Sequence, residues 1–450
     1  MTLVPLPTQI SGALFLAERT RAFLFDSARV GKSGAAIMAA DMIFAQRILV
    51  VTTSSGCGVL RQAFLTWQTL PRRVRVAFVD PPGETDVLIL SWGRLREGVD
   101  LSEMRGPWDL IILDEDHKAS NPSAARSVAV YGQPYEAGAR LIVKDALVQP
   151  EDRVWHLTGS PAGHDLGNMW MRMRASCPER LLADPAKGWP DVLKFTDFRE
   201  RYCVVRPKMI AGEMKDVVFG GKNEFELKER LAGMTLRRTQ QDVGIQPPRY
   251  EFMPLIVSDK RRLELEADGV KAALLQAIDA NTTEDLDLHI GVHRRMTGLI
   301  KAPLIVDAAI DAFDEGVEKL VIAYVHRDVG DMLENGLAKF GVVRLDGSTP
   351  PKAREKKEAE FRQTDRANKR VFLAQIEAAG ESIDLSPANE LWFAETTFTP
   401  KAMNQMAMRI TNVGKARTCF VKVAMIENSI DEALQRCVAR LWESIRKVVN

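Results

Sequence analysis

The sequence predicts an α/β fold with two mainly parallel sheets, each flanked by helices. The apolar runs at 110–113 and within 47–53 lack alternating polar residues, as is typical of strands buried on both faces of a parallel sheet. A similar rhythm of strand and helix starts again in the second half, where strands are expected at 320–324 and 370–374. A length of 450 residues leaves room for two or three domains.

The composition is that of an ordinary globular protein. The formal net charge is only +1, so binding to nucleic acid would need a local basic surface. The first residues lack the pattern of a secretory signal, and no apolar stretch is long enough to cross a membrane. We therefore expect an intracellular, cytoplasmic protein with no membrane partner. An odd number of scattered cysteines favours reduced thiols over a disulfide framework: Cys57, Cys177, Cys203, Cys419 and Cys437.

Two carboxylates follow one of the buried strands directly. Asp114 and Glu115 come after 110–113, at the end of the strand where ligands lie in open α/β sheets. Such a pair suits a magnesium nucleotide, because one carboxylate can hold Mg²⁺ while the other positions or activates a water molecule. A charged turn after a strand is the alternative, since the sequence DEDH alone is a weak signal.

A second motif has the order strand, loop, Gly-Lys-Ser, helix. The strand is expected at 23–25 and the helix at 35–43, with Gly31, Lys32 and Ser33 between them. In such a loop, backbone N–H groups and the helix N-terminus hold phosphates. Lys32 would reach the β- and γ-phosphates, and Ser33 would ligate Mg²⁺. Asp26 replaces the first glycine of the strict pattern, and the Arg29 side chain can point outward unless its φ must be positive.

The residues after the carboxylates give a resemblance to a known family. The segment 114–124 reads DEDHKASNPSA, and it resembles the DEAH motif and the Lys-Asn-Pro-Ser sequence of Swi/Snf-type ATPases in helicase superfamily 2. Asn121, Pro122 and Ser123 are in register, with Ser120 in place of the family's lysine. The family also carries Asp at the position of Asp26, but it usually has Gly at that of Arg29. A TGSP sequence at 158–161, with Trp170 nine residues after its proline, matches the family's spacing.

The resemblance implies roles for residues of the first half. Gln9 would read adenine, although an exposed glutamine in an N-terminal turn is the alternative. Asp114 and Glu115 would be catalytic, with Asp114 and Ser33 holding Mg²⁺. His117, Thr158 and Ser160 would couple the carboxylate site to bound DNA. The residues expected to contact ATP are Gln9, Arg29, Gly31, Lys32 and Ser33, together with Gly380 of the second half.

Further segments resemble the HARP-like annealing helicases, a branch of this family. They are 195–203, 219–223 and 226–227. The segment 236–243 resembles the LRR…DV sequence that closes the first lobe, where Arg237 and Arg238 either brace the lobe or are solvated. Pro247 and Pro248 punctuate the boundary that follows.

The second half follows the family order and departs from it near the end. Residues 346–349 (DGST) match, as do Gln405 and Arg409, which we expect to act in catalysis. Asn412 stands where the family has a second arginine, the arginine finger that reaches the γ-phosphate, and Lys415 replaces the last Gln of the motif. Either Arg409 or Lys415 substitutes for the finger, a protein partner lends an arginine in trans, or hydrolysis is slow.

The resemblance covers nearly the whole chain and implies two RecA-like lobes with ATP between them. We expect lobe one at 1–240, with a protrusion near 180–235, a helical linker or protrusion at 241–300, and lobe two at 301–450. The implied function is that of a DNA-dependent ATPase that translocates on duplex DNA and remodels or anneals double-stranded or branched DNA or DNA–protein complexes. The alternative is a nucleic-acid-binding pseudo-helicase scaffold with weak or no ATP hydrolysis.

Overall fold

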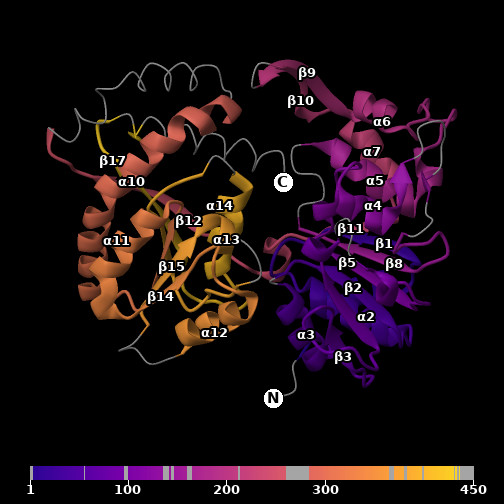
Figure 1. Cartoon of the computed structure of the whole chain (residues 1–450), viewed down its shortest axis with the longest axis horizontal. Helices are drawn as coiled ribbons and strands as arrows, with labels where there is room; N and C mark the ends of the chain where they lie inside the picture. Colours follow the sequence, from indigo (N-terminus) through magenta and orange to yellow (C-terminus); the bar gives the residue numbers. More distant parts are fainter. Residues whose placement is uncertain are drawn as a thin grey trace. The chain divides into compact units, whose positions relative to one another are not determined.

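A computed structural model gives the fold (Figure 1). The chain divides into two compact units, Met1–Val243 and Gly244–Asn450, and each is described by itself. The residues that the structure describes are 4–54, 56–95, 100–134, 141–142, 146–159, 165–210, 213–259, 283–363, 369–379, 383–397, 400–429, 431–432 and 435.

The first unit contains a seven-stranded sheet in which every pairing is parallel. The strand order is β11-β1-β8-β5-β2-β4-β3. A fully parallel sheet needs both faces covered, which explains the continuous apolar runs in its sequence. The strands are β1 (Arg21–Leu24), β2 (Ile48–Thr52), β3 (Val74–Val76), β4 (Val87–Ser91), β5 (Leu110–Asp114), β8 (Val154–Leu157) and β11 (Thr235–Leu236).

Successive side chains of these strands enter two different cores. Ile48 and Val50 pack with residues of α1, α2 and α3, whereas Leu49 and Val51 pack on the other face with residues of α4 to α7. Because the strand period is two, this alternation requires apolar residues at every position. The helices are α1 (Pro7–Ala17), α2 (Lys32–Met42), α3 (Gly56–Trp67), α4 (Ala125–Tyr131), α5 (Trp170–Ser176), α6 (Phe195–Tyr202) and α7 (Glu224–Arg230).

An antiparallel hairpin extends the first unit within the expected protrusion. It pairs β9 (Cys203–Ile210) with β10 (Glu213–Gly221) and lies between α6 and α7 in the sequence. A buried carboxylate holds its base, because Glu226 of α7 accepts hydrogen bonds from Tyr202 Oη at 2.7 Å and Arg230 Nε at 3.0 Å. A shorter pair, β6 (Gln133–Pro134) with β7 (Leu141–Ile142), is also antiparallel.

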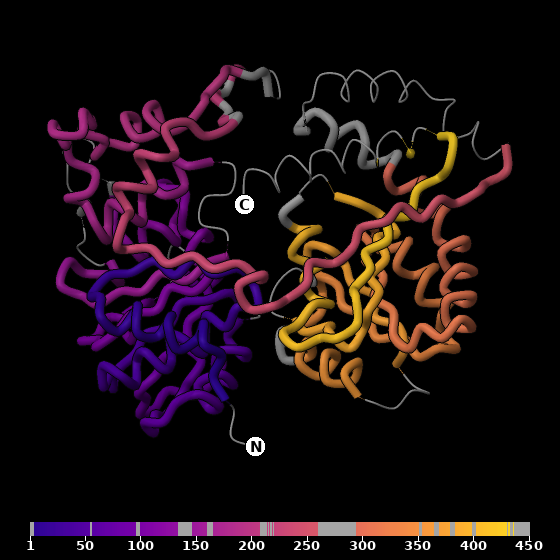
Figure 2. The backbone as a smooth tube through the Cα atoms, turned by 180° about the vertical axis from the view of Figure 1, so that it is seen from behind, coloured from indigo at the N-terminus to yellow at the C-terminus, as the bar shows by residue number. Residues whose placement is uncertain are grey.

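The second unit has a six-stranded parallel sheet in the order β12-β17-β16-β13-β15-β14. Figure 2 shows β12 running beside the yellow β17, although the two lie at opposite ends of this unit's sequence. Helices α10 and α11 pack on one face, and α12, α13 and α14 on the other.

The strands of this sheet are β12 (Arg249–Leu255), β13 (Leu320–Tyr324), β14 (Val342–Leu345), β15 (Val371–Gln375), β16 (Glu390–Phe393) and β17 (Phe420–Ile426). The helices are α10 (Thr283–Asp314), α11 (Arg327–Leu337), α12 (Pro351–Arg362), α13 (Ile376–Ala379) and α14 (Pro400–Ala407).

The expectation of a helical linker over 241–300 is wrong for 249–255, which forms β12. This strand lies at the edge of the sheet, so most of its residues are exposed or half-buried and it tolerates Pro254. Its sequence therefore lacks the apolar run that marks a central strand. The helical expectation holds for 283–300, which begin α10.

Candidate nucleotide site

The Gly-Lys-Ser loop connects β1 to the N-terminus of α2. Gly31 caps the helix with a φ of 100°, and a Cβ atom there would lie 2.7 Å from Cγ of Gln9. A Cβ on Gly34 would lie 2.5 Å from Nε2 of Gln9. The positive φ of Gly31 requires glycine there, and a side chain at Gly34 would displace the amide of Gln9. The Gln9 side chain is 5% exposed and lies against this loop, which excludes the alternative of an exposed glutamine.

The loop holds its lysine by backbone contacts. Nζ of Lys32 donates hydrogen bonds to the carbonyl oxygens of Asp26 at 2.8 Å and Ser27 at 3.3 Å. Ser33 is the second residue of α2 and is half-buried. Arg29 has a φ of 68°, so the backbone here does adopt the left-handed conformation that suits the family's glycine. Such strain costs on the order of 1–3 kcal/mol, which the loop's surroundings must offset.

Arg238 braces the loop from the end of the first unit. Its Nε atom lies 3.0 Å from Oδ1 of the fully buried Asp26, and its Nη2 atom bonds Oδ2 of the same carboxylate. The guanidinium also contacts Oγ of Ser11 in α1 at 2.8 Å. The backbone N–H of Ser27 donates to the carbonyl of Arg238 at 2.9 Å. Arg238 thus connects the loop, α1 and the last strand, so it braces the lobe and is not solvated.

The DEDH segment begins at the carboxyl end of β5, which meets the ends of β1, β2 and β8 at one edge of the sheet. Oδ2 of Asp114 accepts a hydrogen bond from Oγ1 of Thr52 at 2.7 Å. Burial and the neighbouring charge of Glu115 raise the pKa of Asp114 to about 7, although the hydrogen bond from Thr52 and the charge of Lys32 oppose the shift. The raised pKa means that the negative charge of Asp114 is poorly stabilised by the protein alone. A bound cation would stabilise that charge.

Glu115, His117 and Thr158 form a short hydrogen-bonded chain. Oγ1 of Thr158 donates to Oε2 of Glu115 at 3.3 Å and accepts from Nδ1 of His117 at 2.9 Å. Glu115 has a φ of 52°, and its backbone N–H donates to the carbonyl of Leu157 at 2.7 Å. The structure therefore brings together the carboxylate and two of the three residues expected to couple it to DNA. The third, Ser160, lies outside the described residues.

A buried polar network lies directly behind this chain. Oδ2 of Asp116 accepts from Nδ1 of His156 at 2.9 Å, and Oδ1 accepts from Nη1 of Arg172 at 3.1 Å. Nε2 of His156 lies 2.7 Å from Oγ of Ser176. Burial would raise the pKa of Asp116, but the charge of Arg172 and the hydrogen bond from His156 outweigh it and hold that pKa below its usual range. Burial lowers the pKa of His156, although Asp116 opposes the shift.

The expected residues of the second unit lie near its last strand. Gln405 belongs to α14, and Arg409 lies in the short 3-10 helix Met408–Ile410 that follows. Asn412 is held locally, since its Oδ1 accepts from the backbone N–H of Val413 at 2.9 Å. Nζ of Lys415 donates to the carbonyl oxygens of Ser386, Ala388 and Ile410 at 2.5–2.7 Å. These contacts match the three donors of the ammonium group and connect the segment 386–388 to Ile410. Gly380 lies outside the described residues.

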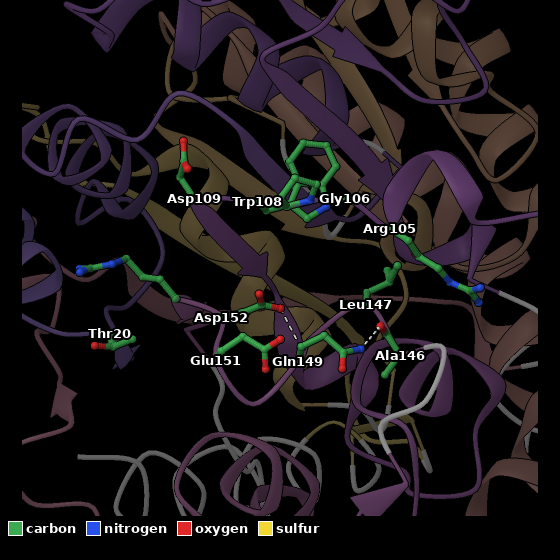
Figure 3. A pocket seen from close by; sticks show the side chains of 12 residues that line it. Thr20, Arg105, Gly106, Trp108, Asp109, Ala146, Leu147, Gln149, Glu151 and Asp152 are labelled. Carbon is green, nitrogen blue, oxygen red and sulfur yellow. Dashed lines mark hydrogen bonds between the residues drawn. The ribbon is translucent and has the colours of Figure 1, made fainter.

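A cavity of about 780 Å³ lies at the opposite end of the first sheet (Figure 3). Trp108 and Asp109, which precede β5, and Asp152 and Arg153, which precede β8, contribute to its wall. Several of its polar groups have partners in the fold. For example, Oδ2 of Asp109 accepts the backbone N–H of Arg47 at 2.8 Å. The cavity is therefore separate from the loop and carboxylates described above.

Magnesium and ATP fit the residues at the first unit's carboxyl edge. A helix N-terminus with a lysine faces phosphate well, and one buried carboxylate beside a hydroxyl suits a cation that keeps several waters. Within the described ranges there is no cluster of three or more His, Cys, Asp or Glu side chains that could form an all-protein metal cage. Magnesium at nucleotide sites does not need such a cage. Among the described helices, none has the length and apolar character to cross a membrane.

Two contributions to the site have only a weak signal in the sequence. The Arg238–Asp26 pair joins residues from the two ends of the first unit, and the double arginine at 237–238 indicated only a possible brace. The partners of Asp116 are scattered over β8 and α5, and no spacing rule connects them. The sequence held one indication in each case. Asp26 replaces the first glycine of the strict phosphate-loop pattern, and Asp116 replaces the alanine of DEAH.

Comparison with known proteins agrees with this architecture. The helicase conserved C-terminal domain profile matches residues 306–414. The chain is 25% identical over 98% of its length to the Caenorhabditis elegans SWI/SNF-related matrix-associated actin-dependent regulator of chromatin subfamily A-like protein 1 homolog, of which it covers 61%. It is 26% identical over 95% of its length to the Bos taurus protein of that name, of which it covers 43%. The chain thus spans about half the length of these relatives.

Two further similarities concern an annealing helicase and a solved structure. The chain is 23% identical over 72% of its length to the Bos taurus DNA annealing helicase and endonuclease ZRANB3, of which it covers 28%. The Sulfolobus solfataricus SWI2/SNF2 ATPase core in complex with dsDNA aligns with a TM-score of 0.44 and 18% identity, covering 99% of this chain and 93% of that one.

Each unit is a parallel α/β sheet with helices on both faces, and the first carries a Gly-Lys-Ser loop after β1 and a DExH sequence after β5. The helicase C-terminal profile within the second unit and the relatives above make the chain similar to Swi/Snf-type proteins, among them an annealing helicase.

The brace predicts a large loss of stability when one partner of the ion pair is removed. Arg238→Met leaves the buried Asp26 carboxylate without its cation, so we expect the free energy of unfolding of the first unit to fall by about 3–5 kcal/mol. Chemical denaturation measures this value. The neighbouring Arg237→Met is the matched control, because Arg237 is exposed and its loss should cost less than about 0.5 kcal/mol. Equal effects of the two substitutions would contradict the brace.

The buried histidine predicts a pH dependence of stability. His156 has a pKa below 6.5 in the folded state and about 6.5 when unfolded, so below pH 6.5 the unfolded state binds more protons. Stability should therefore fall as the pH drops from about 7 to 5, by at most about 1.4 kcal/mol per pH unit for this one group. Urea unfolding of wild type and His156→Gln isolates the contribution. Superimposable pH profiles would show that His156 does not titrate on unfolding.

Proposed function

We propose that this protein is a DNA-dependent ATPase. One observation carries the proposal: Lys32, Asp114 and Glu115 lie at the same edge of the first sheet. Lys32 belongs to the Gly-Lys-Ser loop, against which the Gln9 side chain packs. Similarity to the helicase C-terminal profile and to an annealing helicase supports the same reaction. The alternative of a pseudo-helicase scaffold has no specific support, because these three chemical groups are all present.

The proposed roles follow from the contacts of each side chain. Lys32 exchanges its two backbone carbonyls for the β- and γ-phosphates, while Gln9 binds the adenine edge beside the loop. Asp114 and Ser33 would hold Mg²⁺, which shields phosphate charge and orients the γ-phosphate. Glu115 either accepts a proton from the attacking water or orients that water. The hydrogen bond from Thr158 fixes the direction of the Glu115 carboxylate.

We further propose that turnover drives movement along duplex DNA, with remodelling or annealing of branched DNA as the subtype. Similarity to a DNA annealing helicase and endonuclease supports the subtype. The chain from Glu115 through Thr158 to His117 provides a route by which a contact at the 158–161 segment would alter the hydrolytic carboxylate. Such DNA contacts would address phosphates, not base edges, and binding would be sensitive to salt.

Two substitutions at the site should separate binding from hydrolysis. Lys32→Ala removes the phosphate contact and should abolish turnover, whereas Glu115→Gln keeps the shape of the side chain but should lower kcat by about 10²–10⁴-fold with ATP still bound. Steady-state ATPase assays with duplex, forked and single-stranded DNA, combined with nucleotide-binding titrations, test both. Turnover by Lys32→Ala at the wild-type rate, or lost ATP affinity in Glu115→Gln, would refute the assigned roles.

The family's arginine finger is replaced by Asn412, so we expect weak basal turnover. Arg409, Lys415 or an arginine lent by a partner would then supply the positive charge, and Lys415 would have to exchange its three carbonyl contacts to do so. Loss of an arginine finger costs roughly 10³–10⁵-fold in other phosphoryl-transfer systems, so Asn412→Arg should raise kcat by at least about 10-fold with the KM for ATP little changed.

The matched control for this substitution is Asn412→Gln, which lengthens the side chain without adding charge and should leave kcat unchanged. Both variants are assayed on saturating duplex DNA. A wild type that already turns over rapidly and is slowed by Asn412→Arg would place the finger elsewhere.

A further inference from the structure

The buried carboxylate Asp116 has a position that suggests more than a structural role. It directly follows Glu115, and it stands where the DEAH motif of the family has a small residue. Asp116, His156 and Arg172 are all fully buried, and each is bonded to another member of the network at 3.1 Å or less. Burying a charge is costly unless it is paired, so the Asp116 carboxylate needs both His156 and Arg172 as partners.

The partners lie on three different segments beside the nucleotide site. Asp116 begins the 3-10 helix Asp116–Ala119, His156 lies in β8 two residues before Thr158, and Arg172 lies in α5. The His156 ring also stacks on Phe23 of β1 with centroids 4.5 Å apart, and β1 leads into the phosphate loop. Arg172 is anchored in turn, because its Nη2 donates to the carbonyl of Asn168 at 3.0 Å. The network therefore connects the backbone segments that carry Glu115, Thr158 and Lys32.

Glu115 needs such support because its backbone is strained. A φ of 52° is uncommon for a residue other than glycine and persists only where the surroundings determine it. The N–H of Glu115 is bonded to Leu157, whereas the next residue, Asp116, is held from the side chain by His156 and Arg172. These contacts fix both ends of the strained turn relative to β8.

We infer that Asp116, His156 and Arg172 form a positioning network that holds the Glu115 carboxylate in register with Thr158 for hydrolysis. Asp116 is a positioning residue, because it acts through Glu115 and does not touch the reacting atoms. The inference deepens the proposed ATPase function and rests on it. Its physical basis is that a shift of about 1 Å in a reacting group can cost roughly 100-fold in rate.

The test is Asp116→Asn, which keeps the shape and removes the charge. We expect kcat on duplex DNA to fall by about 10–100-fold with the KM for ATP within about two-fold of wild type. Hydrogen–deuterium exchange of a peptide covering 110–119 should show about ten-fold faster exchange at the Glu115 amide, since its bond to Leu157 depends on the turn. The exchange measurement needs no ATP turnover.

Two further variants separate positioning from stability. Glu226→Gln is the matched control, because it also neutralises a buried carboxylate of the first unit. The partners of Glu226 are the hydroxyl of Tyr202 and two arginines, and they lie at the base of the hairpin, outside the nucleotide site. It should lower the melting temperature without changing kcat. The double variant Asp116→Asn, Arg172→Met removes the unpaired cation, so it should recover stability but not kcat.

The outcomes distinguish this inference from the proposed function. A folded single or double variant with wild-type kcat and wild-type amide exchange would overturn the positioning role. If the wild type itself fails to hydrolyse ATP on any DNA, the proposed ATPase function fails. In that case the exchange rate of Glu115 still decides whether the network holds the turn.

Discussion

The cost of burying charge shapes the carboxyl edge of the first sheet. Three aspartates lie there, and their partners differ. Asp26 is paired with Arg238, Asp116 is paired with Arg172 and bonded by His156, and Asp114 accepts a hydrogen bond from the hydroxyl of Thr52. The first two are satisfied within the protein. The pKa of Asp114 is raised to about 7 by burial and by the charge of Glu115, so a bound cation would stabilise its ionised form.

The same edge concentrates backbone strain. Arg29, Gly31 and Glu115 all have positive φ, although only one of them is glycine. Strain of this kind is retained where several contacts determine the backbone. Here the two ion-paired aspartates provide those contacts, with Asp26 three residues before Arg29 and Asp116 directly after Glu115. Charge burial and backbone strain are thus parts of one arrangement, in which the rigid elements position a few reactive groups.

The second unit departs from the Swi/Snf-type pattern that it resembles at a position where that pattern has a charged residue. Asn412 has no charge to offer, and the ammonium group of Lys415 is satisfied by carbonyl oxygens. The contacts of Lys415 connect the segment 386–388 to Ile410, so this residue stabilises the end of the motif. A lobe that keeps the fold but lacks the arginine would make hydrolysis depend on Arg409 or on another protein. Such dependence is one way in which a motor can be held inactive until it is engaged.

The sequence by itself determined the two parallel sheets and the location of the nucleotide site. Central strands of a parallel sheet are buried on both faces, so they appear as apolar runs, and their carboxyl ends carry the loop at 26–34 and the carboxylates at 114–115. The strands β12 and β17 were not predicted from the sequence. The exposed edge strand β12 has no apolar run, and Lys422 interrupts the apolar run of β17.

Only the tertiary structure decided which polar residues are partners. Arg238 and Asp26 lie at opposite ends of the first unit's sequence, and His156 and Arg172 reach Asp116 from a strand and a helix that follow it. Pairing of this kind depends on the packing of side chains in three dimensions, which no local period encodes. The exposure of Gln9 and Arg238 was decided for the same reason, because burial and contact distances are properties of the folded chain.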